Sequence, residues 1–170
     1  MKNLRSFALA AVLSLAAVGS ALAGVFTDFA ENKLTDALFR GQALGAPATL
    51  YVGLATTACS DASPGTEVSI SGTGYARVAV TASLVNWAGT QSAGSTIASS
   101  GTSGTTSNNG AITFPTPAGN WGSVGWVLIW DASSGGNAWV CITLSASKNV
   151  NNGDAAPAFP AATLSIQVDN

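Results

Sequence analysis

The feature that most constrains this sequence is a series of short strand-like segments with turn residues, and no helical segment, between them. Six such segments are present: residues 48–55, 75–83, 111–114, 123–131, 138–147 and 162–168. Residues 132–137 (ASSGGN) have the composition and length of a hairpin loop, and both faces of residues 123–131 are apolar, as in a central buried strand. Parallel strands would need crossover helices. We therefore predict a mainly β fold, an antiparallel β-sandwich.

One short amphipathic helix is predicted ahead of the strands, at residues 26–39. Thr27 or Asp28 can cap its start, and Arg40 followed by Gly41 suits its end. Its apolar residues recur at helical spacing: Phe26, Phe29, Ala30, Leu34, Ala37 and Leu38. The helix either closes one end of the sandwich or fastens the domain to a partner. The candidate partner contacts on it are Phe26, Phe29, Leu34 and Leu38.

Residues 1–23 have the layout of a secretory signal peptide. Lys2 and Arg5 precede an apolar run at residues 7–18, and Ala21-Leu22-Ala23 is a small-x-small cleavage pattern. The run is short for a membrane span. We expect cleavage after Ala23, export to the periplasm or medium, and no membrane attachment afterwards. A retained hydrophobic anchor and a start codon placed too far upstream are the alternatives.

The remaining chain divides into a helix with its linker, residues 24–46, and the sandwich domain, residues 47–170. Residues 89–109 consist almost wholly of Gly, Ser, Thr, Ala and Asn. Such a segment buries too little apolar surface to fix its own conformation. We predict a flexible loop there, which is either simply mobile or a tip that meets a partner.

The two cysteines, Cys59 and Cys141, form a possible disulfide. An exported protein would allow the bridge, but sequence does not show that the two residues lie close together. The alternative is a buried free thiol at Cys141, which lies in an apolar strand pattern.

The composition argues against catalysis and against nucleic acid as a partner. The chain has no histidine, so Ser-His-Asp and Cys-His arrangements are excluded and zinc is improbable. Only 8% of residues are charged and the net charge is −2, which leaves no basic surface for nucleic acid. We predict a protein that is not an enzyme, with no cofactor and no metal. A surface so poor in charge packs readily against copies of itself, which favours a homo-oligomer.

The chain has five tryptophans, which is many for its length, and three of them lie in strand patterns that predict core positions: Trp126, Trp130 and Trp139. Trp87 and Trp121 lie beside turns and are candidate partner contacts. Exposed tryptophans stack on sugar rings or on neighbouring subunits. This keeps open a carbohydrate-binding β-sandwich module whose partners are cell-surface glycans.

A series of short stretches spread over nearly all of the sequence after the leader has a specific order: residues 26–34 (FTDFAENKL), 37–41, 47–54 (PATLYVGL), 65–68, 74–80 (GYARVAV), 111–115, 120–122, 130–132, 135–137, 148–150 and 152–154. In these stretches the chain resembles a family of small tailed-bacteriophage structural proteins labelled tail fibre or tail proteins. Each stretch is short, but their order and spacing are specific.

The resemblance implies a β-rich structural protein of the virion, either fibre-like or a particle decoration, with no catalytic residues. Such a protein acts by self-association or by docking on other virion proteins. An exported surface or filament subunit is the alternative.

Overall fold

The computed structural model of the chain describes residues 25–168, so the leader, residues 1–23, lies outside the described residues. Within that range the chain forms one helix and eight strands: α1 (Asp28–Phe39), β1 (Thr49–Ala55), β2 (Val78–Thr81), β3 (Thr105–Ser107), β4 (Ile112–Thr113), β5 (Gly122–Trp130), β6 (Ala138–Val150), β7 (Ala158–Phe159) and β8 (Ser165–Gln167). Between residues 25 and 168, no helix is long and apolar enough to cross a membrane.

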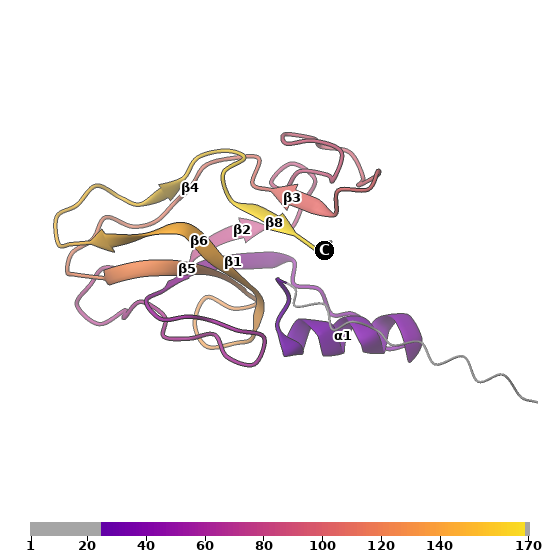
Figure 1. Cartoon of the computed structure of the whole chain (residues 1–170), viewed down its shortest axis with the longest axis horizontal. Coiled ribbons are helices and arrows are strands. Elements are labelled where there is room, and N and C mark those ends of the chain that lie inside the picture. Colours follow the sequence, from indigo (N-terminus) through magenta and orange to yellow (C-terminus); the bar gives the residue numbers. More distant parts are fainter. Residues whose placement is uncertain (1–24, 169–170) are drawn as a thin grey trace, which may run out of the picture.

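A four-stranded antiparallel sheet in the order β2-β1-β5-β6 forms the centre of the molecule (Figure 1). The predicted hairpin is confirmed, since β5 pairs with β6 and Ile129 lies opposite Val140. β5 is a central strand, and Val127 and Leu128, which point to opposite faces, are both fully buried. The apolar residues on both faces of this segment therefore correctly predicted a central strand of the sheet.

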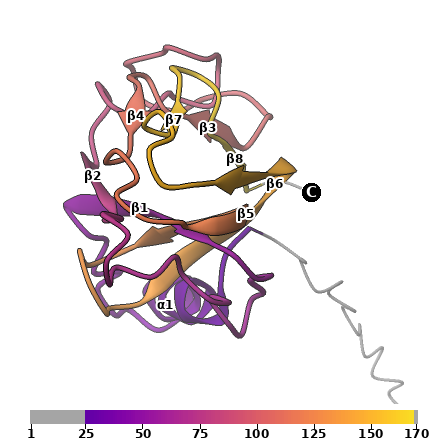
Figure 2. The same ribbon diagram turned by 90° about the vertical axis from the view of Figure 1, so that its left-hand side faces the viewer.

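Two short ribbons, β3–β8 and β4–β7, cover one face of the sheet, and α1 lies on the other (Figure 2). The main core lies between the sheet and the ribbons. Its buried residues include Val52, Leu54, Val127 and Ile129 from the sheet, with Ile112, Phe114, Leu164 and Ile166 from the covering segments. The mainly β, antiparallel fold with one N-terminal helix is confirmed. The second layer consists of two separate ribbons because its strands are only two or three residues long.

Hydrogen bonds fix the entry of α1 to the edge of β6. The Thr27 hydroxyl accepts from the backbone N–H of Ala30 (3.4 Å) as the helix cap and donates to the carbonyl of Ala138 (2.5 Å). Just before the helix, Phe26 lies opposite Val140 in an antiparallel bridge. At the other end Gly41 adopts φ +66°, as the Arg40-Gly41 pair predicts.

Several predicted segments differ from the structure. β2 begins only at Val78, because the preceding Tyr75 and Arg77 leave the ladder and enter a buried cluster. β6 continues to Val150 rather than ending at residue 147. β3 (Thr105–Ser107) lies inside the segment predicted as a flexible loop, and it pairs with β8.

The buried side chain of Asn108 explains the order at β3. This side chain is 1% exposed, and its Nδ2 donates to the carbonyls of Gly110 (2.7 Å), Phe159 (3.3 Å) and Pro160 (2.8 Å). Its Oδ1 accepts from the backbone N–H of Leu164 (2.8 Å). One amide therefore joins the ends of both ribbons, which gives an otherwise polar segment a fixed position.

We expect Asn108→Ala to lower the free energy of unfolding by about 2–3 kcal/mol, because buried backbone groups lose their partners. Asn120→Ala is the control, since Asn120 is exposed and accepts one hydrogen bond, from Asn152. Urea unfolding followed by tryptophan fluorescence measures both variants. An equal decrease in the free energy of unfolding in the two variants would contradict the role assigned to Asn108.

Candidate interaction surface

The second half of α1 exposes apolar side chains to solvent. Leu34 is 38% exposed, Leu38 66% and Phe39 82%, whereas Ala30 in the first half is buried. Only the N-terminal half of the helix is held by aromatic packing, where the Phe29 ring meets the Trp139 ring edge-on at 5.4 Å. The C-terminal half thus presents apolar surface to solvent, most of it from Leu38 and Phe39, a feature typical of a protein contact.

The four helix residues predicted as partner contacts divide into two pairs. Phe26 packs on the main core and Phe29 on Trp139, so these two side chains attach the helix to the domain. Leu34 and Leu38 face solvent. The helix lies on the outer face of the sheet and does not close an end of the sandwich (Figure 2), and a partner contact through its second half stays a prediction. Phe39, the most exposed large apolar residue on α1, was not among the predicted contacts.

The expectation that Trp121 is exposed is wrong. Trp121 is 4% exposed, its Nε1 donates to the carbonyl of Thr73 (2.9 Å), and its ring packs edge-on against Tyr75 (5.3 Å) and Phe114 (6.3 Å). Its place beside a turn did not expose it, because the turn folds back onto the core. Trp87 is half-buried against the same core. Trp121 therefore offers no ring for a sugar to stack on.

Arg77 is the centre of a buried charged cluster that sequence analysis missed. Its side chain is 5% exposed, and its Nε and Nη2 donate to the two carboxylate oxygens of Glu67, both at 2.7 Å. Nη1 donates to the carbonyls of Ala132 (2.7 Å) and Gly135 (2.8 Å), and the guanidinium lies 3.7 Å from the centre of the Trp130 ring. Arg77 thus fixes the β5–β6 hairpin loop to the segment that carries Glu67.

Tyr75 completes this cluster. Its hydroxyl donates to Glu67 Oε1 (2.9 Å) and accepts from the backbone N–H of Leu54 (2.8 Å). Burial, above all, raises the pKa of this hydroxyl well beyond its usual range, although the hydrogen bond from Leu54 opposes the shift. The phenol therefore stays protonated and acts as a fixed donor.

The carboxylate of Asp131 is also used structurally. It accepts from the backbone N–H (2.7 Å) and side-chain Nδ2 (3.0 Å) of Asn137. Burial alone would raise the pKa of Asp131, but these hydrogen bonds outweigh it and lower the pKa below the usual value. Among residues 25–168, no group of three or more His, Cys, Asp or Glu side chains is placed to hold a metal ion.

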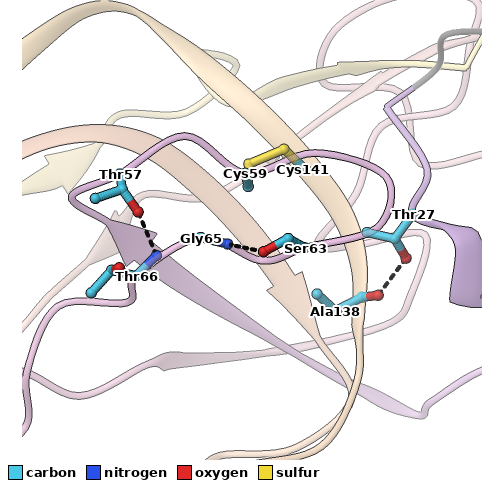
Figure 3. Close-up of a disulfide and its surroundings, with 8 residues drawn as sticks. All are labelled: Thr27, Thr57, Cys59, Ser63, Gly65, Thr66, Ala138 and Cys141. Carbon is cyan, nitrogen blue, oxygen red and sulfur yellow. Dashed lines mark hydrogen bonds between the residues drawn. A yellow bond between two sulfur atoms is a disulfide. The ribbon is translucent and has the colours of Figure 1, made fainter.

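A disulfide joins Cys59 to Cys141, with the two Cα atoms 5.9 Å apart (Figure 3). It ties the loop between β1 and β2 to β6, on the sheet face that also carries α1. The loop is further ordered by a hydrogen bond from the Thr66 N–H to the Thr57 hydroxyl (2.7 Å). Gly65 has φ +67°, and a Cβ there would lie 2.6 Å from two backbone carbonyl oxygens. The loop is therefore a fixed covering over this face.

The family model described as "Podophage GP4 fiber I protein gp80" matches residues 25–167, which is almost the whole of the described structure. No curated protein matches the chain.

Proposed function

This chain belongs to the podophage GP4 fiber I protein gp80 family, and on that premise we propose that it is a non-enzymatic structural protein of the virion. It acts by docking on other virion proteins or by self-association. The observation that carries the proposal is the family match over residues 25–167, together with an apolar helix end that the domain itself leaves uncovered. A surface of this kind suits a permanent place in an assembly.

The state of two acidic side chains, Glu67 and Asp131, supports a non-enzymatic role. Glu67 is paired with Arg77 and Tyr75, and Asp131 is held by Asn137. A general acid or base needs a proton-exchanging group directed toward a substrate. These two carboxylates are instead directed toward the protein's own donors.

An exported surface or filament subunit is the second candidate, and the disulfide favours it. Disulfides persist in oxidising compartments and are rare in the cytosol. The bridge between Cys59 and Cys141 therefore agrees with the signal-peptide pattern of residues 1–23. An exported protein of this family would keep the β fold and the exposed helix end while acting at a cell surface.

Mass spectrometry of purified particles tests the first candidate against the second. We expect peptides of this chain in the particles, in many copies per particle. The N-terminal peptide should be recorded as well, since a start at Gly24 would show that the leader is cleaved. Absence from particles, with recovery from the periplasm or the medium, would contradict the virion assignment and support the exported subunit.

A further inference from the structure

Residues 57–64, in the loop between β1 and β2, are attached to the rest of the domain mainly through Cys59. We call this segment the latch loop. Seven of its eight residues are exposed, and Cys59 is half-buried. A segment that buries so little apolar surface has low local stability of its own. The disulfide from Cys59 to Cys141 therefore supplies most of what holds the latch loop in place.

Few hydrogen bonds join the latch loop to neighbouring elements. Among residues 25–168, one links it to α1, from the N–H of Asp28 to the carbonyl of Asp61 (2.9 Å), and none links it to β6. Asp28 is the first residue of α1, so the latch loop supplies the acceptor for one of the free N–H groups of the first helical turn. The bond from the Ser60 N–H to the Ser63 carbonyl (2.7 Å) stabilises the shape of the loop but not its attachment.

The chain on both sides of the latch loop is anchored without the disulfide. The Thr56 N–H donates to the Thr66 carbonyl (2.8 Å), and the Val68 N–H donates to the Leu54 carbonyl (2.9 Å). Val68 is also buried in the main core. The two ends of the loop therefore stay together if its middle moves, which is the arrangement of a compact surface loop with closely spaced ends.

The latch loop lies on a second apolar cluster, on the sheet face that also carries α1. The buried members of this cluster are Ala55, Leu128, Trp130 and Ala138. Cys59 is the latch-loop residue that packs against them, and Figure 3 shows its disulfide as the link to β6. Leu128 is fully buried. Movement of the loop away from the sheet would therefore expose apolar surface around Leu128.

The disulfide is placed where a thiol can reach it, since neither Cys59 nor Cys141 is buried. Exposed disulfides are the ones that are reduced most readily. A thiolate of a dithiol reductant attacks one sulfur and forms a mixed disulfide, which the second thiol of the reductant then resolves. Cys59 and Cys141 gain two electrons and two protons and become thiols, and the reductant leaves as its own disulfide.

We propose that the Cys59–Cys141 disulfide is a redox latch for this face of the sheet. In the oxidised protein it holds the latch loop over Leu128 and against the first turn of α1. Reduction by a dithiol releases the loop and removes the Asp61 carbonyl from Asp28, while the sheet and both ribbons stay folded. The inference goes beyond the proposed function, and it applies equally to a virion protein and to an exported subunit.

NMR relaxation of backbone amides in the purified protein, before and after treatment with dithiothreitol, tests the release. The order parameters of residues 58–63 should fall from about 0.85, the value of a rigid backbone, to below about 0.6. Those of Thr106 and Ile166, which pair in the β3–β8 ribbon, should stay near about 0.85 and serve as the internal control. A latch loop that stays rigid after complete reduction would overturn the proposal. Loss of the folded spectrum as a whole would also overturn it, because the bridge would then hold the entire domain together.

The variant that carries both Cys59→Ala and Cys141→Ala is the matched control. The chain has only these two cysteines. The variant should therefore have a flexible latch loop from the start and should not respond to dithiothreitol. A response in this variant would show that the reductant acts elsewhere and would contradict the latch.

A neutral paramagnetic chelate in the solvent tests whether the loop covers the second apolar cluster. Reduction should broaden the methyl signals of Leu128, because the released loop lets the probe approach. The methyl signals of Leu54 are the control, since Leu54 is buried in the main core at 3% exposure and should stay sharp in both states. Unchanged Leu128 signals in the reduced protein would overturn the inference.

Discussion

Arg77→Ala is expected to lower the free energy of unfolding by about 3–5 kcal/mol, because it leaves the Glu67 carboxylate largely buried without its counter-charge. The Glu67 side chain is 25% exposed and that of Arg77 only 5%. The variant also removes the donor to the carbonyls of Ala132 and Gly135 and the cation above the Trp130 ring. Chemical unfolding of the two proteins at neutral pH measures the difference.

Arg40→Ala is the matched control for this prediction. Arg40 also pairs with a carboxylate, that of Asp36 at 2.8 Å, but the side chains are 71% and 38% exposed. An exposed pair of this kind contributes little, so the control should change stability by no more than about 0.5 kcal/mol. Similar losses in the two variants would show that the Arg77 cluster is no more stabilising than a surface ion pair.

A double variant separates the contribution of the Arg77–Glu67 ion pair to stability from the contribution of the surrounding contacts. Arg77→Met with Glu67→Leu should be less destabilised than the sum of the two single changes, because neither charge is then left buried alone. The lost bonds to the hairpin loop remain as a residual cost. Additive losses would mean that the two side chains act independently, contrary to their two short hydrogen bonds.

The sheet was predictable because its patterns are local. Residues 123–131 are apolar on both faces, which specifies a central strand, and a six-residue Gly-containing loop specifies its hairpin partner. The cap at Thr27 and the left-handed Gly41 were likewise visible in sequence. In each case neighbouring residues alone determine the geometry.

The Arg77 cluster and the Asn108 amide were not predictable, because their partners are distant in sequence. Arg77 continues an alternating strand pattern, so its charge indicates a solvent-facing position. Its partners lie up to 58 residues away. Asn108 sits in a Gly/Ser/Thr-rich stretch with no apolar pattern, yet it bonds to Leu164, 56 residues away. The local sequence shows whether a segment has an apolar pattern. It does not show which hydrogen-bond partners a distant segment supplies.

The interaction surface was predicted only in part, because the exposure of a helix also depends on residues distant in sequence. Helical spacing placed Leu34 and Leu38 on an apolar side, but periodicity does not say how much of that side the domain covers. The structure covers Phe26 and Phe29 and leaves the other end exposed, where Phe39 adds to the surface. Trp121 shows the converse error, since a place beside a turn indicates exposure only when the turn points away from the core.

Replacing both cysteines, Cys59→Ala with Cys141→Ala, is expected to lower the free energy of unfolding by about 4.5 kcal/mol, because the bridge closes a long loop. The two residues are 82 positions apart, and the unfolded chain gains conformational entropy when so long a loop is released. Guanidinium unfolding should give the same midpoint for the double variant with and without a reducing thiol. The unaltered protein should match it only when reduced.

The size of this effect makes the disulfide a test of where the protein matures. A chain assembled into particles in a reducing cytosol would carry both thiols free and would lack this stabilisation. An exported chain would carry the bridge. Thiol alkylation of protein taken directly from particles, followed by mass measurement, distinguishes the two states. If the bridge is present there but reduction leaves the unfolding midpoint unchanged, the link from β6 to the loop around Cys59 does not stabilise the fold, and the loop-closure argument is wrong.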